Sequence, residues 1–339
     1  MSRTARSSGI VVLIGLAVAA GCLQEAPRGN PLDPESDNYR DVGSVAGQVV
    51  RFYPPHAPIE GVDVRLTQNG GAALLARTGA DGRFRFDDVP AGRYAVAAEK
   101  DGYAAGRDSV TVAAGDAADG GALRLDGLPV ARSVVLRTLY VGRWWPEAEP
   151  DVYLLDVTAD VEDPDGLSDV ASVTLHGPTP GRALTLQPTS EAGRFGRTVP
   201  ADSLGAATLH ALMGQPFVVE VRDHAGHATT SPPQTPARII EETPVPVSPQ
   251  GLESVADPRP VLTWQPAALR FPFTYRLDVV RVVEANLHTV LQTVERIAPE
   301  TTTLRVPAAL AAGTYYWTLS VVDAFGNRSR SKEAGFQVE

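Results

Sequence analysis

The chain has 339 residues, of which 43% are hydrophobic and 6% aromatic, and its net charge at pH 7 is −10. This acidic balance argues against nucleic acid as a partner, because phosphate binding needs clustered lysine and arginine. Cys22 is the only cysteine, so no intrachain disulfide can form and each domain must depend on its own hydrophobic core.

The N-terminal segment carries the pattern of an export signal. Arg3 and Arg6 precede an apolar run from Ile10 to Ala20, which ends just before Cys22. The run is shorter than the roughly 20 apolar residues that a membrane-spanning helix needs, and it fits a secretory apolar region with a small-residue cleavage site. The segment resembles a bacterial lipoprotein signal. The resemblance implies cleavage after residues 1–21 and a lipid on the sulfur and amine of Cys22; the alternative is a secreted protein with a chance cysteine.

Residues 22–42 are polar and rich in proline and glycine, which predicts a flexible tether. Leu23 rather than Asp follows the cysteine. By analogy with Gram-negative sorting, this favours the outer membrane, so we expect a protein of the cell envelope whose membrane partner is reached through the N-terminal lipid.

Residues 43–127 predict a first β-sandwich. Val62–Leu66 alternates apolar and polar side chains, as a half-buried strand does, and Asp81-Gly82 is a hairpin turn that places Phe84 and Phe86 on one face. The pattern T-x-x-D-G-x-F…G-x-Y…GY, from Thr78 to Tyr103, resembles the carboxypeptidase regulatory-like (transthyretin-like, carbohydrate-binding-like) family. The resemblance implies a β scaffold that packs against neighbours or binds glycans. It implies no peptidase, since none of the six histidines has Glu three residues later.

Residues 128–243 predict an Ig-like sandwich followed by a proline-rich linker. The expected strands are 133–141, 152–161, 172–176, 195–199 and 217–222. In the second of these, Leu155, Val157, Ala159 and Val161 share one face, as in an antiparallel sheet with one buried side. Ala206–Met213 predicts either a helical turn or another strand, and Arg238–Ile240 is expected to add a last strand.

Residues 244–339 predict a third sandwich, which makes the fold class all-β with three tandem domains. Its expected strands are 261–264, 275–279, 303–306 and 315–322. The early Trp264 and the stretch from Leu310 to Asn327 resemble fibronectin type III, in which a late tyrosine forms a tyrosine corner. Alternation favours Tyr315 as that residue, and the motif spacing also admits Tyr316.

The second and third domains contain the same strand-and-turn motif near their C-terminal ends. Asp223 to His227 and Asp323 to Asn327 both read as a strand followed by a turn in which glycine supplies a positive φ. His224 and His227 have a spacing that would suit a metal pair, but their counterparts Ala324 and Asn327 have no metal chemistry. We therefore favour a plain turn.

Five carboxylates fall within ten residues of the second domain, where hard oxygen ligands would suit calcium. The candidate ligands are Asp160, Asp163, Asp165 and Asp169, with Glu162 between them. A second interpretation competes with this one, because Asp163 to Gly166 has the sequence of a type I turn. We favour the turn and keep calcium as the one cofactor that the sequence suggests.

Tyr140, Trp144 and Trp145 flank a predicted loop. Such aromatics can stack on sugar rings or anchor a protein interface. The alternative, which we favour, is that they fill the seam between the first two domains or cap a sandwich.

No catalytic motif of the nucleophile-elbow, P-loop or dinucleotide-binding type is present, and no thiol is left free. The sequence therefore predicts a non-catalytic lipoprotein that projects from the cell surface as a binding or structural module. Two alternatives stay open: a carbohydrate-binding lipoprotein that captures polysaccharide, and an accessory subunit of an envelope secretion or transport complex.

Overall fold

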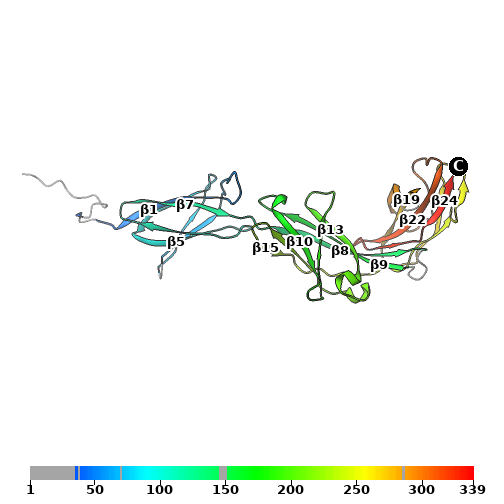
Figure 1. The fold of residues 1–339 in the computed structure, drawn as a ribbon, viewed down its shortest axis with the longest axis horizontal. Helices are drawn as coiled ribbons and strands as arrows, with labels where there is room; N and C mark the ends of the chain where they lie inside the picture. Colours follow the sequence, from blue (N-terminus) through cyan, green and yellow to red (C-terminus); the bar gives the residue numbers. More distant parts are fainter. Residues whose placement is uncertain (1–34, 37–38, 69–70, 145–150, 285–286) are drawn as a thin grey trace, which may run out of the picture.

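The computed structural model describes residues 35–36, 39–68, 71–144, 151–284 and 287–339. The predicted signal peptide, Cys22, most of the tether and Trp145 lie outside these residues. Strands dominate the described chain and form three lobes that follow one another along the long axis (Figure 1). Among the described residues no helix is both long and apolar enough to cross a membrane.

The first lobe is a sandwich of two sheets, with strand orders β4-β1-β7 and β3-β2-β5-β6. The strands are β1 (Val42–Arg51), β2 (Asp63–Thr67), β3 (Leu74–Arg77), β4 (Arg83–Pro90), β5 (Gly92–Glu99), β6 (Gly106–Val112) and β7 (Ala117–Leu125). Phe84, Phe86, Tyr94 and Val96 are buried in one core cluster between the sheets. The alternation predicted from the sequence is therefore confirmed, because every second side chain of a strand faces the same side.

The second lobe packs the sheet β11-β10-β14-β15 against the strands β12-β13-β9-β8. The elements are β8 (Val130–Gly142), β9 (Asp151–Glu162), η1 (Leu167–Asp169), β10 (Val170–His176), β11 (Ala183–Thr185), β12 (Gln187–Pro188), β13 (Arg194–Pro200), η2 (Ala201–Leu204), η3 (Leu209–Leu212), β14 (Val218–Asp223) and β15 (Ala228–Thr230). The four inward residues predicted on β9 are all buried. Ala206–Met213 contains the single-turn helix η3, whose N-cap Thr208 accepts a hydrogen bond from Ala211 N.

The third lobe has its core around Trp264, Tyr275 and Trp317. Its strands are β16 (Val245–Ser248), β17 (Glu253–Val255), β18 (Val261–Gln265), β19 (Phe273–Glu284), β20 (Leu287–Ile297), β21 (Thr303–Arg305), β22 (Gly313–Asp323), β23 (Arg328–Arg330) and β24 (Ala334–Val338). Tyr315 is buried, and its hydroxyl donates to Ala311 O at 2.8 Å. Tyr315, and not Tyr316, therefore forms the tyrosine corner.

The first domain contains the same corner. Tyr94 donates its hydroxyl proton to Pro90 O at 2.9 Å, four residues upstream, as Tyr315 does. In both domains a glycine with φ near 155° stands two residues before the tyrosine, at Gly92 and Gly313. The shared G-x-Y pattern thus marks the same local structure, in which a hydrogen bond fixes the start of a core strand.

The expectation that Arg238–Ile240 adds a last strand to the second domain is wrong. This described segment forms no strand. Ile239 packs against the core of the second domain, whereas Ile240 is buried in the core of the third. The segment therefore crosses the junction between the second and third domains, and its two apolar side chains pack into two different cores.

The second and third domains share one sheet. β23 pairs in parallel with β8, with Arg328 opposite Leu139 and Arg330 opposite Val141. This pairing joins strands of both domains into a ten-stranded sheet. Backbone hydrogen bonds therefore tie these two domains directly, in addition to the linker that connects them.

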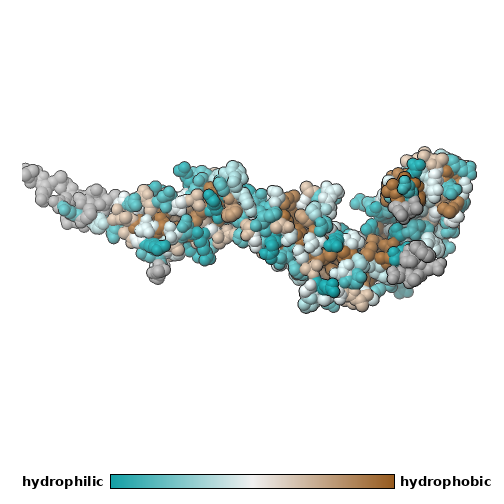
Figure 2. All heavy atoms as spheres, viewed as in Figure 1, coloured by the Kyte–Doolittle hydropathy of each residue, from teal (hydrophilic) through white to brown (hydrophobic). Residues whose placement is uncertain are grey.

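Hydrophilic residues predominate on the visible surface, and hydrophobic areas appear on all three lobes, one of them near the end of the molecule at which β19 lies (Figure 2). Exposed apolar side chains at the β19–β20 end include Val283, Leu287, Val290 and Leu291. β20 ends the described strand order of the shared sheet, so Leu287, Val290 and Leu291 lie on an edge strand, whereas Val283 lies near the end of the neighbouring β19.

Candidate functional site

The two sibling turns have the same internal hydrogen bonds. Asp223 N donates to His227 O and Asp323 N donates to Asn327 O, each at 3.1 Å. In return Oδ1 of each aspartate accepts a hydrogen bond from the backbone N–H four residues later, at 2.7 Å from His227 and 3.0 Å from Asn327. Gly226 has a positive φ of 97°. The turn predicted from the sequence is confirmed.

The last residue of each turn also contacts the preceding domain. Nδ1 of His227 lies 2.7 Å from Oδ2 of Asp126, which follows β7 at the end of the first domain. In the next junction, Oδ1 of Asn327 accepts a hydrogen bond from Thr138 N on β8 at 2.9 Å. The same turn thus joins domain two to domain one, and domain three to domain two. Sequence reasoning matched His227 with Asn327 but missed this interdomain role.

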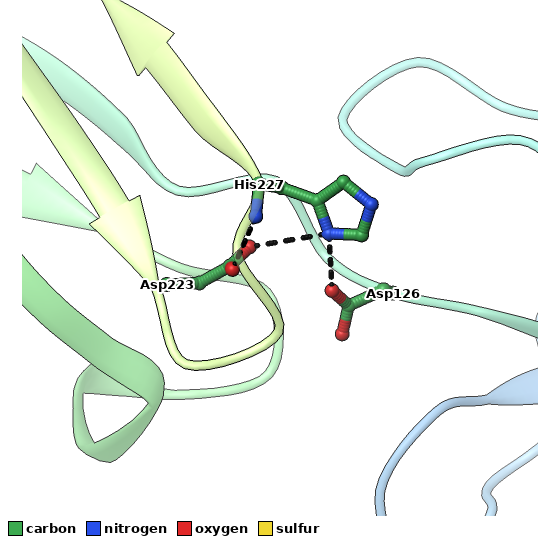
Figure 3. Close-up of side chains that lie close together, drawn as sticks. All are labelled: Asp126, Asp223 and His227. Carbon is green, nitrogen blue, oxygen red and sulfur yellow. Dashed lines mark hydrogen bonds and ion pairs between the residues drawn. The ribbon is translucent and has the colours of Figure 1, made fainter.

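Five carboxylates gather where the first two domains meet. They come from the end of domain one, from the segment between β9 and β10, and from the end of β14; they are Asp126, Asp163, Asp165, Asp169 and Asp223. Figure 3 shows Asp126 and Asp223 converging on His227 from the two domains. The exposed fractions of Asp126, Asp169 and Asp223 are only 4%, 6% and 2%.

Several hydrogen bonds fix these carboxylates. Asp165 Oδ2 accepts from Gly127 N at 2.6 Å, and this bond joins the two domains. Asp169 Oδ1 accepts from the hydroxyl of Tyr53, in domain one, at 2.8 Å. Within domain two, Asp163 Oδ1 accepts a hydrogen bond from Asp165 N at 2.7 Å. The Asp163–Gly166 segment is also the predicted turn, closed by a bond from Gly166 N to Asp163 O at 3.0 Å.

The electrostatics of the cluster are dominated by negative charge. Burial raises the pKa of Asp163 to about 6, although its hydrogen bond from Asp165 N works in the opposite direction. Burial also raises the pKa of Asp126. The hydrogen bond to Asp169 is the largest cause of the rise of the Tyr53 pKa to about 12. Arg51 brings a positive charge, with its guanidinium 3.7 Å from Asp165 and hydrogen-bonded to Pro164 O.

The calcium ligands predicted from the sequence are only partly brought together. Asp163, Asp165 and Asp169 belong to the junction cluster, but Asp160 is paired with Arg194 at 2.8 Å. Glu162 is likewise paired with Arg132. On β9 alternate side chains face opposite sides, so proximity in sequence did not bring Asp160 to the cluster. Asp126 and Asp223 take its place, from segments that no local pattern connects.

The predicted aromatic set is divided. Trp144 is 62% exposed, its Nε1 donates to Glu333 O at 2.8 Å, and Lys332 Nζ lies 4.1 Å from the ring centroid. Trp144 therefore lines the seam between domains two and three, not the seam between one and two that we favoured. Tyr140 packs instead against Tyr153, with ring centroids 5.1 Å apart, and donates to Asp151 at 2.6 Å. Trp145 lies outside the described residues.

A surface hollow adjoins Trp144. Val141, Val152 and Leu154 of domain two line it together with Arg330 and Glu333 of domain three. The hollow offers an apolar floor, an exposed aromatic ring and one charged pair, Arg330 with Glu333. These are groups that a sugar ring could contact.

Comparison with known proteins identifies the first domain. Residues 44–125 match the family model of the carboxypeptidase regulatory-like domain. No curated protein matches the chain. Among solved structures, the chain is similar to BcpA, the major pilin subunit of Bacillus cereus, at 10% identity over 88% of this chain and 95% of that one, with a TM-score of 0.30.

Two further solved structures are similar to the chain. The fibronectin(III)-like modules of Clostridium thermocellum CbhA are 13% identical over 62% of this chain and 93% of that one, with a TM-score of 0.27. A putative carbohydrate binding protein from Bacteroides uniformis is 12% identical over 59% of this chain and 100% of that one, with a TM-score of 0.23. Residues 44–125, the first of three tandem β-sandwiches, are therefore the part of the chain that matches the carboxypeptidase regulatory-like domain.

Proposed function

We propose that the protein is a non-catalytic lipoprotein of the cell envelope, whose three sandwiches form a stiff module that projects from the outer membrane. A lipid on Cys22 would anchor the chain, and residues 22–42 would separate the lipid from the first domain. The order of the lobes supports this proposal, because the third domain lies at the opposite end of the long axis from the first (Figure 1).

The observation that carries the proposal is the way the domains are joined. Each junction has the same turn contacting the preceding domain, through His227 in one case and Asn327 in the other. The second junction adds the backbone pairing of β8 with β23. Interfaces within a chain that lack such bonds usually permit relative domain motion. A chain with both junctions bonded behaves as one elongated body, which suits a spacer or a presenting arm.

The anchor is tested by metabolic labelling with palmitate in the native host. The parent chain should incorporate label and fractionate with the outer membrane, and Cys22→Ala should do neither. Protease added to intact cells should cleave the third domain if it points outward. Label that persists in Cys22→Ala, or that never appears in the parent, would refute the anchor.

A second candidate function is glycan capture, and the exposed ring of Trp144 beside its hollow favours it. Affinity electrophoresis on neutral and acidic polysaccharides tests it, with retardation of the parent and loss of retardation in Trp144→Ala. Phe325→Ala is the matched control, because Phe325 is similarly exposed at 65% but lines a different surface hollow from Trp144. Equal migration of parent and Trp144→Ala on every glycan would dispose of this candidate.

A further inference from the structure

Four buried carboxylate oxygens at the first junction have no hydrogen-bond partner among the described residues. They are Asp126 Oδ1, Asp163 Oδ2, Asp169 Oδ2 and Asp223 Oδ2. In each of these carboxylates the other oxygen accepts a hydrogen bond, from His227 Nδ1, Asp165 N, Tyr53 or His227 N. Asp223 Oδ2 has, besides, an ion-pair contact of 3.5 Å with His227 Nδ1. Buried polar atoms are nearly always satisfied, and an unpaired buried charge is costly. Four such oxygens in one place therefore point to a cationic ligand.

Three of the carboxylates lie close enough together to hold one ion. One ligand atom from each of Asp126, Asp165 and Asp169 lies within 4.8 Å of the others, and the same holds for Asp126, Asp223 and His227. Oxygens on opposite sides of a calcium ion at about 2.4 Å are about 4.8 Å apart. We propose that the junction of the first two domains binds calcium through Asp126, Asp165 and Asp169.

The donor set favours calcium over other metals. All five acidic groups offer hard carboxylate oxygens, which calcium accepts in numbers of six to eight and in flexible geometry. Magnesium demands a near-octahedral set at shorter distances, and zinc prefers nitrogen and sulfur ligands. His227 is the one nitrogen ligand in the groups that the structure brings together. Among the described residues, Arg51 is the one cationic side chain paired with a member of the cluster, apart from the two histidines, so most of the negative charge there stays uncompensated.

A calcium ion here would join two domains. Asp126 belongs to the end of domain one, whereas Asp163, Asp165, Asp169 and Asp223 belong to domain two. The ion would thus add to the existing bonds from Tyr53 and Gly127 and hold the two sandwiches in one orientation. Calcium binding goes beyond the proposed function: it does not depend on the lipid, and failure of palmitate labelling would leave it untouched.

The test uses the full chain stripped of metal with a chelator and then titrated with terbium, a luminescent substitute for calcium. Tyr53 contacts Asp169 directly, so excitation of tyrosine should produce terbium emission that excess calcium removes. Calcium at about 100 times its dissociation constant should raise the melting temperature by roughly 5–10 °C, given the linkage relation and the usual size dependence. Small-angle scattering should show a narrower distribution of domain orientations with calcium.

Two variants locate the site. The side chain of Asp126 lies outside both hydrophobic cores. Asp126→Asn should therefore abolish the calcium-competed terbium emission and the calcium-induced rise in melting temperature, while the circular dichroism spectrum stays that of the parent. Asp160→Asn is the control, because it was a predicted ligand but is paired with Arg194, and it should retain both signals. Loss of signal in Asp160→Asn but not in Asp126→Asn would overturn the proposal. So would the absence of any calcium effect, or a shift with zinc alone that requires His227.

Discussion

Replacing Asn327 with alanine should selectively weaken the junction between the second and third domains. The side chain is 1% exposed, its Oδ1 accepts from Thr138 N at 2.9 Å, and its Nδ2 donates to Asp323 at 3.0 Å. Asn327→Ala leaves the Thr138 N–H buried without this partner, which costs about 1–3 kcal/mol, and the lost bond to Asp323 adds about 1 kcal/mol. The expected loss is therefore about 2–4 kcal/mol.

Urea denaturation and calorimetry measure this loss. For two domains of this size, it corresponds to a fall of roughly 5–15 °C in melting temperature. The fall should come with separation of the second and third domain transitions, since the residue joins them. Phe325→Ala is the control from the same turn; its side chain is exposed, so its effect should stay within about 0.5 kcal/mol. If Asn327→Ala is no more destabilising than Phe325→Ala, the turn does not hold the domains together.

Two further predictions concern the first junction and the tyrosine corner. A Cβ added at Gly127 would lie 2.9 Å from Pro164 and 3.0 Å from Asp165, so Gly127→Ala should push the first two domains apart at a cost of about 1–3 kcal/mol. Small-angle scattering should then show an altered distance between the first two domains. An unchanged scattering profile would mean that Pro164 and Asp165 can move aside without displacing the domains. Tyr315→Phe removes the bond to Ala311 O and should destabilise the third domain by about 1 kcal/mol in urea denaturation. A variant as stable as the parent would show that the corner contributes nothing.

Much of the fold could be predicted because strand periodicity is a local property. Alternation in the sequence correctly indicated the inward faces of Phe84 and Phe86, of Leu155 to Val161, and of Tyr315 to Val321. Alternation also favoured Tyr315 over Tyr316 as the tyrosine-corner residue, and the hydrogen bond of that corner spans only four residues. The Asp223 and Asp323 turns were also local, and their glycines and aspartates sufficed to identify them.

The candidate calcium site shows where such reasoning stops. The sequence grouped Asp160 with Asp163, Asp165 and Asp169 because they are neighbours in the chain, but strand alternation turned Asp160 towards Arg194. The repeated turn contained a signal for the interdomain contacts. His227 and Asn327 occupy matching positions in the two turns, which suggests that both residues make the same kind of contact. The partner of that contact could not be named from either turn alone.

The sequence by itself determined the all-β architecture, the family resemblance of the first domain and the inward faces of several core strands, since these depend on patterns within a few residues. Only the tertiary structure decided which surfaces meet. Asp126 and His227 are 101 positions apart, and Thr138 and Asn327 are 189 positions apart. No local pattern encodes contacts at such separations, because they follow from how whole domains pack. The buried carboxylates between the first two domains, and the sheet shared by the last two, exist only as a result of that packing.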